Sequence, residues 1–245
     1  MYKNKKILGL ITARGGSTSI PNKNLAPLLG KPLIWYTIRA AQKSQLLTHT
    51  VVSTDSEEIA SICREHGTEV PFLRPSELAQ DDTPHLPVVQ HALEWLKAHE
   101  GQEYDYVMIL QPTSPLRIAE DIDEAIKNAV DTDADSVMGM VALSDFDPRK
   151  VKKIVGGVIA SMFEDEGAQS ARRQRGQEAY KRNCAIYLTK TGHIMNGDLF
   201  GPVSRPYVMP AERSIDINEP HDLAYAEFLL HILSSRGAAE GSREV

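Results

Sequence analysis

The stretch ILGLITARGGSTSIPNKN, residues 7–24, constrains the fold more than any other part of the chain. An apolar run, interrupted only by Gly9, leads to Arg14, and Gly15 and Gly16 follow directly. A short apolar run bounded by glycine is typical of a buried strand in a parallel sheet. Paired glycines after such a strand allow a sharp turn and bring backbone N–H groups close to a ligand. The sequence therefore predicts a first strand that ends in a tight turn facing a ligand.

Four polar side chains flank this turn and indicate what it would bind. Arg14 and Lys23 are positively charged, and Ser17 and Asn24 are neutral hydrogen-bond donors. A strand, a glycine turn and cationic flanks together describe a binding loop for an anion, most simply for the phosphates of a nucleotide. The segment is not a P-loop, because no Gly-Lys-Ser/Thr closes it, and it is not a G-x-G-x-x-G fingerprint. A plain turn is the alternative interpretation.

Predicted strands and helices alternate along most of the chain. Ser56 and Gly67 bound one helix as its N-cap and its C-terminal stop. Apolar runs predict further strands at 50–54, 70–73, 106–110, 136–141 and 183–189, and further helices at 33–42, 88–99, 120–131 and 219–232. Such alternation predicts an α/β fold with a mostly parallel central sheet and flanking helices. We expect one domain over residues 1–233 and a disordered tail over residues 234–245.

A polar loop follows the predicted strand at residues 70–73. Arg74 lies at its base, and Thr83 and His85 lie near its tip. Pro84 excludes regular strand pairing there. A loop of this kind can close over a ligand, and an ordinary surface loop is the alternative.

A rigid turn follows the most apolar predicted strand, residues 106–110, which we expect at the centre of the sheet. The turn reads QPTSPLR, and its prolines fix the positions of Gln111, Thr113, Ser114 and Arg117. Ligands of open α/β sheets bind beyond the carboxyl ends of the strands. This turn and the glycine turn should therefore open on one crevice.

Polar and apolar residues alternate strictly in SIDIN, residues 214–218. The alternation predicts a strand with Ser214, Asp216 and Asn218 on one face and both isoleucines toward the core. The polar face is rich in oxygen atoms and suits a hard divalent cation. An edge strand with its polar face in water is the alternative.

Two features lie between the last predicted strands of the sheet. Residues 151–159, with adjacent glycines, are typical of a hairpin. A run of arginines then includes Arg173 and is interrupted by Gln174. Such a cluster contacts a ligand or a partner subunit, or it forms a solvated face.

The composition limits the kinds of partner. The 245 residues carry 27 Lys and Arg against 33 Asp and Glu, a formal net charge of −6, which argues against nucleic acid or an anionic membrane as the main partner. No run approaches the about 20 apolar residues of a membrane helix, and the first apolar run is too short for a signal sequence. The cysteines, Cys63 and Cys184, have no metal-site spacing. We expect reduced thiols and a cytoplasmic protein.

Several separate motifs combine into one pattern. ARGGS with PNKN, STD, FLRPSELAQDDTP, LQPTSPLR, RRQ, NCAIY and VMPAERSIDIN occur in this order between Ile7 and about Leu230. With these motifs the sequence resembles the acylneuraminate cytidylyltransferases, also called CMP-sialic acid synthetases, over nearly its whole length. LQPTSPLR and SIDI are the most specific of them.

The resemblance implies a Rossmann-like nucleotidyltransferase fold. It also implies a small dimerisation arm, here about residues 143–180, that crosses to the second subunit of a homodimer. The implied reaction joins CTP to a nine-carbon α-keto acid sugar and gives the CMP-sugar and pyrophosphate. The sugar hydroxyl would attack the α-phosphorus in line, and Mg²⁺ or Mn²⁺ with cationic side chains would neutralise the charge on the leaving group.

Carried over position by position, the resemblance implies roles for individual residues. The implied nucleotide-binding residues are Arg14, Gly15, Gly16, Ser17, Asn24, Arg74, Thr83 and His85. The implied sugar-binding residues are Gln111, Ser114, Arg117, Gln174, Asn183 and Tyr187. The implied catalytic residues are Lys23, Arg173 and Asp216, and the implied metal ligands are Asp216 and Asn218.

Two positions depart from the family pattern. Thr18 follows Ser17 where the family has lysine, so Lys23 or an arginine of the RRQ motif would have to supply that charge. Asn218 stands where the family has a second aspartate. Its amide oxygen can serve a cation but cannot act as a general base, so Asp216 or a metal-bound hydroxide would have to take the proton.

Two other functions stay open from the sequence. One keeps the enzyme type but changes the partners, as in a guanylyltransferase or an enzyme for legionaminic or pseudaminic acid. The other is a catalytically weak nucleotide-binding relative, which the two departures suggest.

Overall fold

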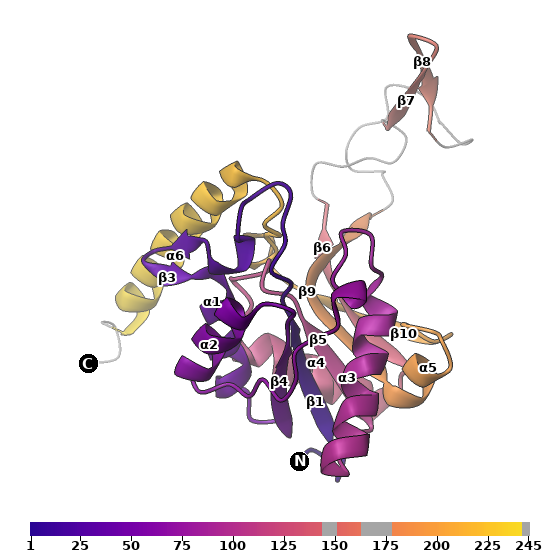
Figure 1. Cartoon of the computed structure of the whole chain (residues 1–245). Helices are drawn as coiled ribbons and strands as arrows, with labels where there is room; N and C mark the ends of the chain where they lie inside the picture. The colour runs from indigo at the N-terminus through magenta and orange to yellow at the C-terminus, as the bar shows by residue number, and fades with distance from the viewer. Residues whose placement is uncertain (144–150, 163–177, 242–245) are drawn as a thin grey trace.

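The computed structural model describes residues 1–143, 151–162 and 178–241. A six-stranded sheet in the order β10–β6–β9–β5–β1–β4 lies at its centre (Figure 1). The strands are β1 (Ile7–Thr12), β4 (His49–Ser53), β5 (Tyr106–Leu110), β6 (Ser136–Ala142), β9 (Tyr180–Lys190) and β10 (Ser204–Val208). β1 pairs in parallel with β4 and β5, and β10 with β6, whereas β9 is antiparallel to both its neighbours. The predicted mostly parallel sheet is confirmed.

Helices pack on both faces of this sheet. One face carries α1 (Leu33–Lys43), α2 (Glu57–Glu65) and α4 (Ala119–Thr132), and the other carries α3 (His85–Glu100) and α5 (Thr191–Met195). Successive strand residues point to opposite faces, so in β1 Ile11 joins the first apolar cluster and Leu10 joins the second. The expected α/β fold with flanking helices is confirmed.

A third apolar cluster joins the two ends of the chain. The helix α6 (Pro220–Gly241) places Ala226 and Leu229 against the segment that follows β1. That segment contains the short helix η1 (Lys23–Leu25) and the paired strands β2 (Pro27–Leu28) and β3 (Lys31–Pro32). Ile215 and Ile217 enter the same cluster, which brings the SIDIN segment next to the glycine turn.

The predicted central strand and the predicted ends of the helix that begins after Ser56 are confirmed. β5 lies inside the sheet, and all of its residues are buried. Ser56 caps α2, since its hydroxyl accepts a hydrogen bond from the Ile59 N–H, and Gly67 follows the helix with a φ of 75°. These elements fix the carboxyl ends of β1, β4 and β5 at one edge of the sheet.

β9 contains a bulge that shapes its inner face. Its register against β6 shifts at Gly139, and Cys184 has a φ of 62°, a conformation that residues with side chains rarely adopt. A Cβ at Gly139 would lie 2.4 Å from the Asn183 Oδ1, so only glycine fits opposite the bulge. Asn183 is turned inward, and its amide donates a hydrogen bond to the Ser214 hydroxyl at 3.0 Å.

Two segments predicted as strands form no ladder in the part of the chain that the structure describes. Residues 70–73 form one isolated bridge, between Leu73 and Thr54, and Glu69 forms another with Val51, because Pro71 between them has no N–H to donate. Residues 214–218 connect the short helix η5 (Ala211–Arg213) to α6. Their isoleucines are buried as predicted, but Ser214 is buried as well and does not share a solvent face with Asp216.

The C-terminal segment also differs from the prediction. Residues 234–241 continue α6 and do not form a disordered tail, and the Ser234 hydroxyl donates to the Leu230 carbonyl within the helix. A helix whose first turns pack on a core extends readily, since adding a residue costs less than starting a helix. Residues 242–245 lie outside the described part. No helix in the described residues is both long enough and apolar enough to span a bilayer.

The predicted hairpin is confirmed as an antiparallel pair, β7 (Lys152–Val155) and β8 (Val158–Ser161). It forms a sheet of its own and stands away from the central sheet (Figure 1). Apolar side chains that are 61% to 76% exposed cover it, namely Ile154, Val155, Val158 and Ile159. Much of the rest of the expected arm, about residues 143–180, lies outside the described residues.

Candidate active site

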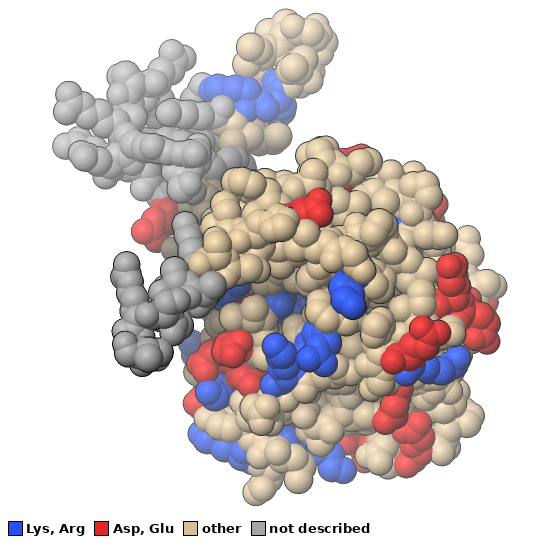
Figure 2. Space-filling model, turned by 90° about the vertical axis from the view of Figure 1, so that its left-hand side faces the viewer, with Lys and Arg blue, Asp and Glu red and all other residues tan. Residues whose placement is uncertain are grey.

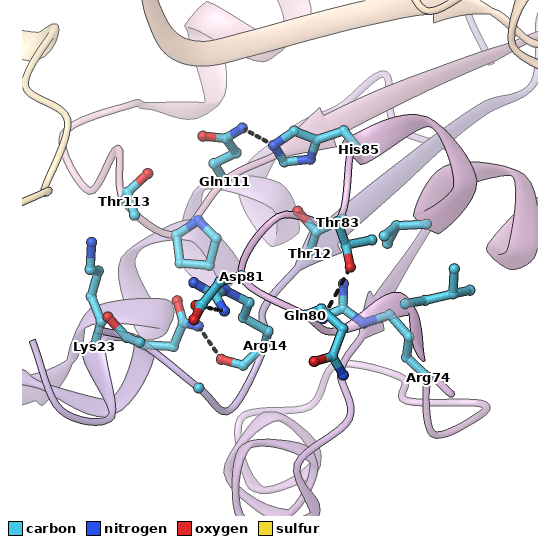
Figure 3. A pocket seen from close by; sticks show the side chains of 16 residues that line it. Thr12, Arg14, Lys23, Arg74, Gln80, Asp81, Thr83, His85, Gln111 and Thr113 are labelled. Carbon is cyan, nitrogen blue, oxygen red and sulfur yellow. Dashed lines mark hydrogen bonds and ion pairs between the residues drawn. The ribbon is translucent and has the colours of Figure 1, made fainter. Parts of the chain in front are cut away.

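A pocket of about 250 Å³ lies beyond the carboxyl ends of β1 and β5 (Figure 3). Its walls are the glycine turn after β1, the loop that leads from Arg74 to α3, and the turn after β5. The prediction that the two turns open on one crevice is therefore confirmed. Of the predicted site residues, Arg14, Gly16, Ser17, Lys23, Asn24, Arg74, Thr83, His85 and Gln111 line it.

The pocket is cationic although the whole chain is acidic. Arg14, Lys23 and Arg74 line it, and Asp81 is the sole acidic residue on its walls within the described ranges. Figure 2 shows one face of the molecule on which Lys and Arg side chains gather in and beside a hollow. A pocket with this charge balance favours an anionic ligand.

Hydrogen bonds hold the glycine turn in shape. Asp55 Oδ1 accepts a bond from the Gly15 N–H, and Asn24 Nδ2 donates to the Arg14 carbonyl, both at 2.9 Å. A Cβ at Gly15 would lie 3.0 Å from the Ser56 Cβ, so the turn packs closely on the start of α2. Gly15 and Asn24 therefore shape the turn, while the Arg14 side chain extends into the pocket and pairs with Asp81.

Arg74 is a buried cation with unused donors. Its side chain is 5% exposed, and its backbone N–H donates to the Thr54 carbonyl at 2.7 Å. Asp55 Oδ1 lies 3.7 Å from Nη2, and neither Nε nor Nη2 has a hydrogen-bond partner among the described residues. Burial lowers the pKa of Arg74 despite the opposing effect of Asp55. A guanidinium held in this way suits a ligand that brings acceptor atoms.

His85 and Gln111 meet across the pocket mouth (Figure 3). The His85 Nε2 lies 3.0 Å from the Gln111 Nε2, so the ring nitrogen accepts and the amide donates. Partial removal from water, together with the positive charge of Arg74, lowers the pKa of His85. A neutral imidazole is the form that accepts this bond, and the bond joins the start of α3 to the turn after β5.

Lys23 connects the glycine turn to the SIDIN segment. Its ammonium donates to the carbonyls of Ile217 at 3.1 Å and Asn218 at 3.3 Å. The Ser19 hydroxyl also donates to the Asn218 carbonyl, and the Ile217 N–H donates to Thr113 at 2.8 Å. The segment with the predicted metal ligands is therefore fastened to the pocket rim.

Asp216 and Asn218 are neighbours, as a shared metal site requires. Asn218 Nδ2 donates to Asp216 Oδ2 at 3.0 Å, and Asp216 is half-buried while Asn218 is exposed. The described ranges contain no group of three or more His, Cys, Asp or Glu side chains that could hold a metal. One carboxylate and one amide oxygen fit a cation that takes its other ligands from a nucleotide's phosphates and from water, which is the usual mode of Mg²⁺.

A second, larger pocket of about 720 Å³ lies on the other side of this segment. Asp216 and Asn183 form part of its wall, as do the cations Lys181 and Arg182 of β9 and the ring of Tyr225. Its wall carries two cations and two carboxylates, Asp216 and Asp222, together with amide groups and an aromatic ring, a set that suits a hydroxyl-rich ligand.

The predicted sugar-binding residues are not all on a pocket wall. Ser114 is 1% exposed and donates to the Asn183 carbonyl at 3.5 Å, and Arg117 is 2% exposed and bonds only within the protein. The structure therefore corrects the predicted sugar contacts of Ser114 and Arg117, because both side chains are used to join the turn after β5 to β9. Tyr187 is 9% exposed, and its hydroxyl lies 3.5 Å from Cys184 Sγ. Arg173 and Gln174 lie outside the described residues.

Asp55 and Asp81 had no predicted site role. Asp55 stands in the STD motif and supports both Gly15 and Arg74. Asp81 lies in the loop that was predicted to close over a ligand, but its pairing with Arg14 joins segments far apart in the sequence. No periodicity or spacing in the sequence signals such a pair.

Residues 8–215 match the family described as Cytidylyltransferase. The chain is 31% identical over 228 residues to the pseudaminic acid cytidylyltransferase of Campylobacter jejuni, covering 93% of this chain and 97% of that protein. It is 32% identical to the N-acylneuraminate cytidylyltransferase of Escherichia coli O18:K1:H7, covering 90% of this chain and 51% of that protein.

The fold is similar to that of a CMP:2-keto-3-deoxy-manno-octonic acid synthetase complexed with CTP. The TM-score is 0.66 at 17% identity, and the match covers 92% of this chain and 98% of that one. The family expected from the motifs and the expected nucleotidyltransferase fold are both confirmed. The chain belongs to the cytidylyltransferase family.

Proposed function

We propose that this protein transfers the cytidylyl group of CTP to a nine-carbon α-keto acid sugar of the sialic, pseudaminic or legionaminic type and releases pyrophosphate. The observation that supports this most directly is the cationic pocket in which Arg14, Lys23 and Arg74 converge beside the glycine turn. A triphosphate brings several negative charges and many acceptor oxygens to such a pocket. The similarity to the two named cytidylyltransferases over nearly the whole chain supports the choice of CTP and of an acidic sugar.

Catalysis in this reaction is mainly a matter of position and charge. The sugar hydroxyl attacks the α-phosphorus, the bond to pyrophosphate breaks, and negative charge builds on the leaving group. Arg14 and Lys23, which line this pocket, would stabilise that charge, and Arg74 with Thr83 and His85 forms the wall proposed for ribose and base. Asp216, on the wall of the second pocket, is the proposed acceptor of the hydroxyl proton.

We further propose that Asp216 and Asn218 hold Mg²⁺ together with the nucleotide phosphates. The short distance between their side chains supports this role. Such a cation would supply charge neutralisation at the phosphates. Asn218 cannot take a proton, so Asp216, the one carboxylate of the SIDIN segment, is the residue of this segment that can accept it.

The second pocket is the proposed place of the sugar. Lys181 and Arg182, which line this pocket, would face the carboxylate of the sugar. Gln111, on the wall of the first pocket, would contact the sugar where the two substrates meet. Arg173 and Gln174 keep their implied roles as proposals.

The exposed apolar hairpin supports the proposal of a homodimer. Isolated apolar patches of this kind on a protein's surface usually mark an interface. The unpaired state of Cys63 and Cys184 is consistent with the cytoplasmic location that we expect.

One experiment tests the proposal directly. The protein is incubated with Mg²⁺, with each of CTP, GTP, UTP and ATP, and with each of N-acetylneuraminic, pseudaminic and legionaminic acid, and pyrophosphate is measured. We expect release with CTP and one of these acids, and loss of release by about 100-fold in Arg14→Ala, since a charge-assisted phosphate contact is removed. Release with GTP alone would show that the nucleotide substrate is GTP and not CTP. No release with any pair would refute the proposed enzymatic activity.

A further inference from the structure

Asp81 occupies an unusual place in the pocket. Its carboxylate pairs with the Arg14 guanidinium, and the two side chains point toward one another in Figure 3. A carboxylate presents acceptor oxygens to an arginine in the way that a phosphate does. Asp81 therefore uses the cation that the proposed function gives to the triphosphate.

The position of Asp81 is set by its loop. The Gln80 N–H donates to the Thr83 hydroxyl at 3.0 Å, and the Thr83 N–H donates back to the Gln80 carbonyl at 3.2 Å. The Gln80 side chain donates to the Ser76 carbonyl at 2.6 Å. These bonds form a tight turn that presents Asp81 to the pocket, while its neighbour Asp82 is exposed and does not line it.

The ion pair is open to water on one side. The Asp81 side chain is 63% exposed and the Arg14 side chain is 32% exposed. Pairs with this exposure are weak, so an incoming anion of higher charge can displace the carboxylate. A ligand that does not contact Arg14 can bind without displacing the Asp81 carboxylate.

We propose that Asp81 is a built-in competitor of the polyphosphate, which weakens the binding of triphosphate and of pyrophosphate and leaves the binding of a nucleoside monophosphate unchanged. The proposal rests on the proposed function, because it assigns Arg14 to the leaving group. After transfer, the return of Asp81 to Arg14 favours release of pyrophosphate. The residue thereby discriminates between ligands that carry a polyphosphate and ligands that carry a single phosphate.

The expected size of the effect follows from the exposure of the pair. Removal of the competing ion pair accounts for up to about fivefold in affinity. Removal of one negative charge beside a polyphosphate adds a smaller factor at the effective dielectric constant of a protein surface. We expect Asp81→Asn to bind CTP and pyrophosphate on the order of 10-fold more tightly.

The test is a calorimetric measurement of CTP, pyrophosphate and CMP binding to the full chain with Mg²⁺ and without sugar. The proteins are the wild type, Asp81→Asn, and the matched control Asp82→Asn on the adjacent residue. Each substitution is also made in an Arg14→Met background. We expect the gain for CTP and pyrophosphate in Asp81→Asn alone, no more than a twofold change for CMP, and a gain below threefold in the Arg14→Met background.

Each other result overturns a defined part of the reasoning. Weaker CTP binding by Asp81→Asn would make Asp81 a ligand contact and refute the competition. An equal gain in Asp82→Asn, or an undiminished gain in the Arg14→Met background, would reduce the effect to net charge and refute the role of the pair. If the wild type binds CTP and Asp81→Asn binds it equally, the inference alone fails, whereas a wild type that binds no nucleotide refutes the proposed function.

Discussion

Replacement of Arg117 by methionine should lower the stability of the fold, without a direct effect on substrate binding. The Arg117 guanidinium donates to the Ala185 carbonyl at 2.8 Å, to the Thr37 hydroxyl at 2.7 Å and to the Gln111 carbonyl at 3.3 Å. These acceptors belong to β9, α1 and the turn after β5. One side chain thus ties a strand, a helix and a pocket wall together.

The magnitude follows from the burial of these groups. Each hydrogen bond from a charged donor contributes about 1.5 to 3 kcal/mol, and the cost of burying the guanidinium offsets much of that sum. Burial lowers the pKa of Arg117 to about 10, so the group is still charged at neutral pH. Methionine fills most of the volume but provides no donor for the Ala185 carbonyl and the Thr37 hydroxyl, which costs about 1 to 3 kcal/mol for each of these groups, or roughly 4 kcal/mol in all. That loss corresponds to a fall in Tm of about 8 to 16 °C for a domain of this size.

Thermal and urea unfolding measure the effect. Arg39→Met is the matched control, because Arg39 lies on α1 as well but is exposed and bonds only to Gln42. It should change stability by less than about 0.5 kcal/mol. If Arg117→Met unfolds like the wild type but loses its affinity for the sugar, the structural role is wrong and the contact implied by the family resemblance is restored.

Three further changes have defined outcomes. Asn218→Asp should bind Mn²⁺ about tenfold more tightly by electron paramagnetic resonance titration, since it replaces the amide that bonds Asp216 with a second carboxylate; unchanged affinity would remove this segment from the metal site. Cys184→Gly should raise the free energy of unfolding by about 1 kcal/mol, because glycine adopts the φ of 62° without strain; a lower Tm would mean that packing of the thiol outweighs the strain. Ile154→Asp with Ile159→Asp should turn a dimer into a monomer in light scattering, because both side chains are more than 70% exposed on the hairpin; a wild type that is already monomeric contradicts the proposed arm.

Local sequence signals were sufficient where the physics is local. The apolar run of β5, the cap at Ser56 and the glycine turn after β1 depend on neighbours in the chain, and all were predicted. The placement of the two turns at one crevice followed as well, because parallel strands end at the same edge of a sheet. Two strand predictions were wrong because they depend on partners outside the segment. Pro71 cannot donate to a neighbouring strand, so residues 70–73 form no ladder, and the hydrogen bond from Asn183 holds Ser214 inside the protein.

The roles of the charged side chains depended on contacts between distant segments. Arg14 and Arg117 look alike in the sequence, as arginines that follow apolar strands, but one lies in a pocket and the other is enclosed and bonded to three partners. Periodicity assigns a residue to a face of an element, and it carries no information on which charge lies opposite. The alternating strands, the anion-binding turn and the family pattern could therefore be read from residue order, whereas the use of Arg117 as a tie, of Lys23 as a link to Asn218 and of Asp81 as a partner of Arg14 arises only when the folded chain brings those atoms within hydrogen-bond distance.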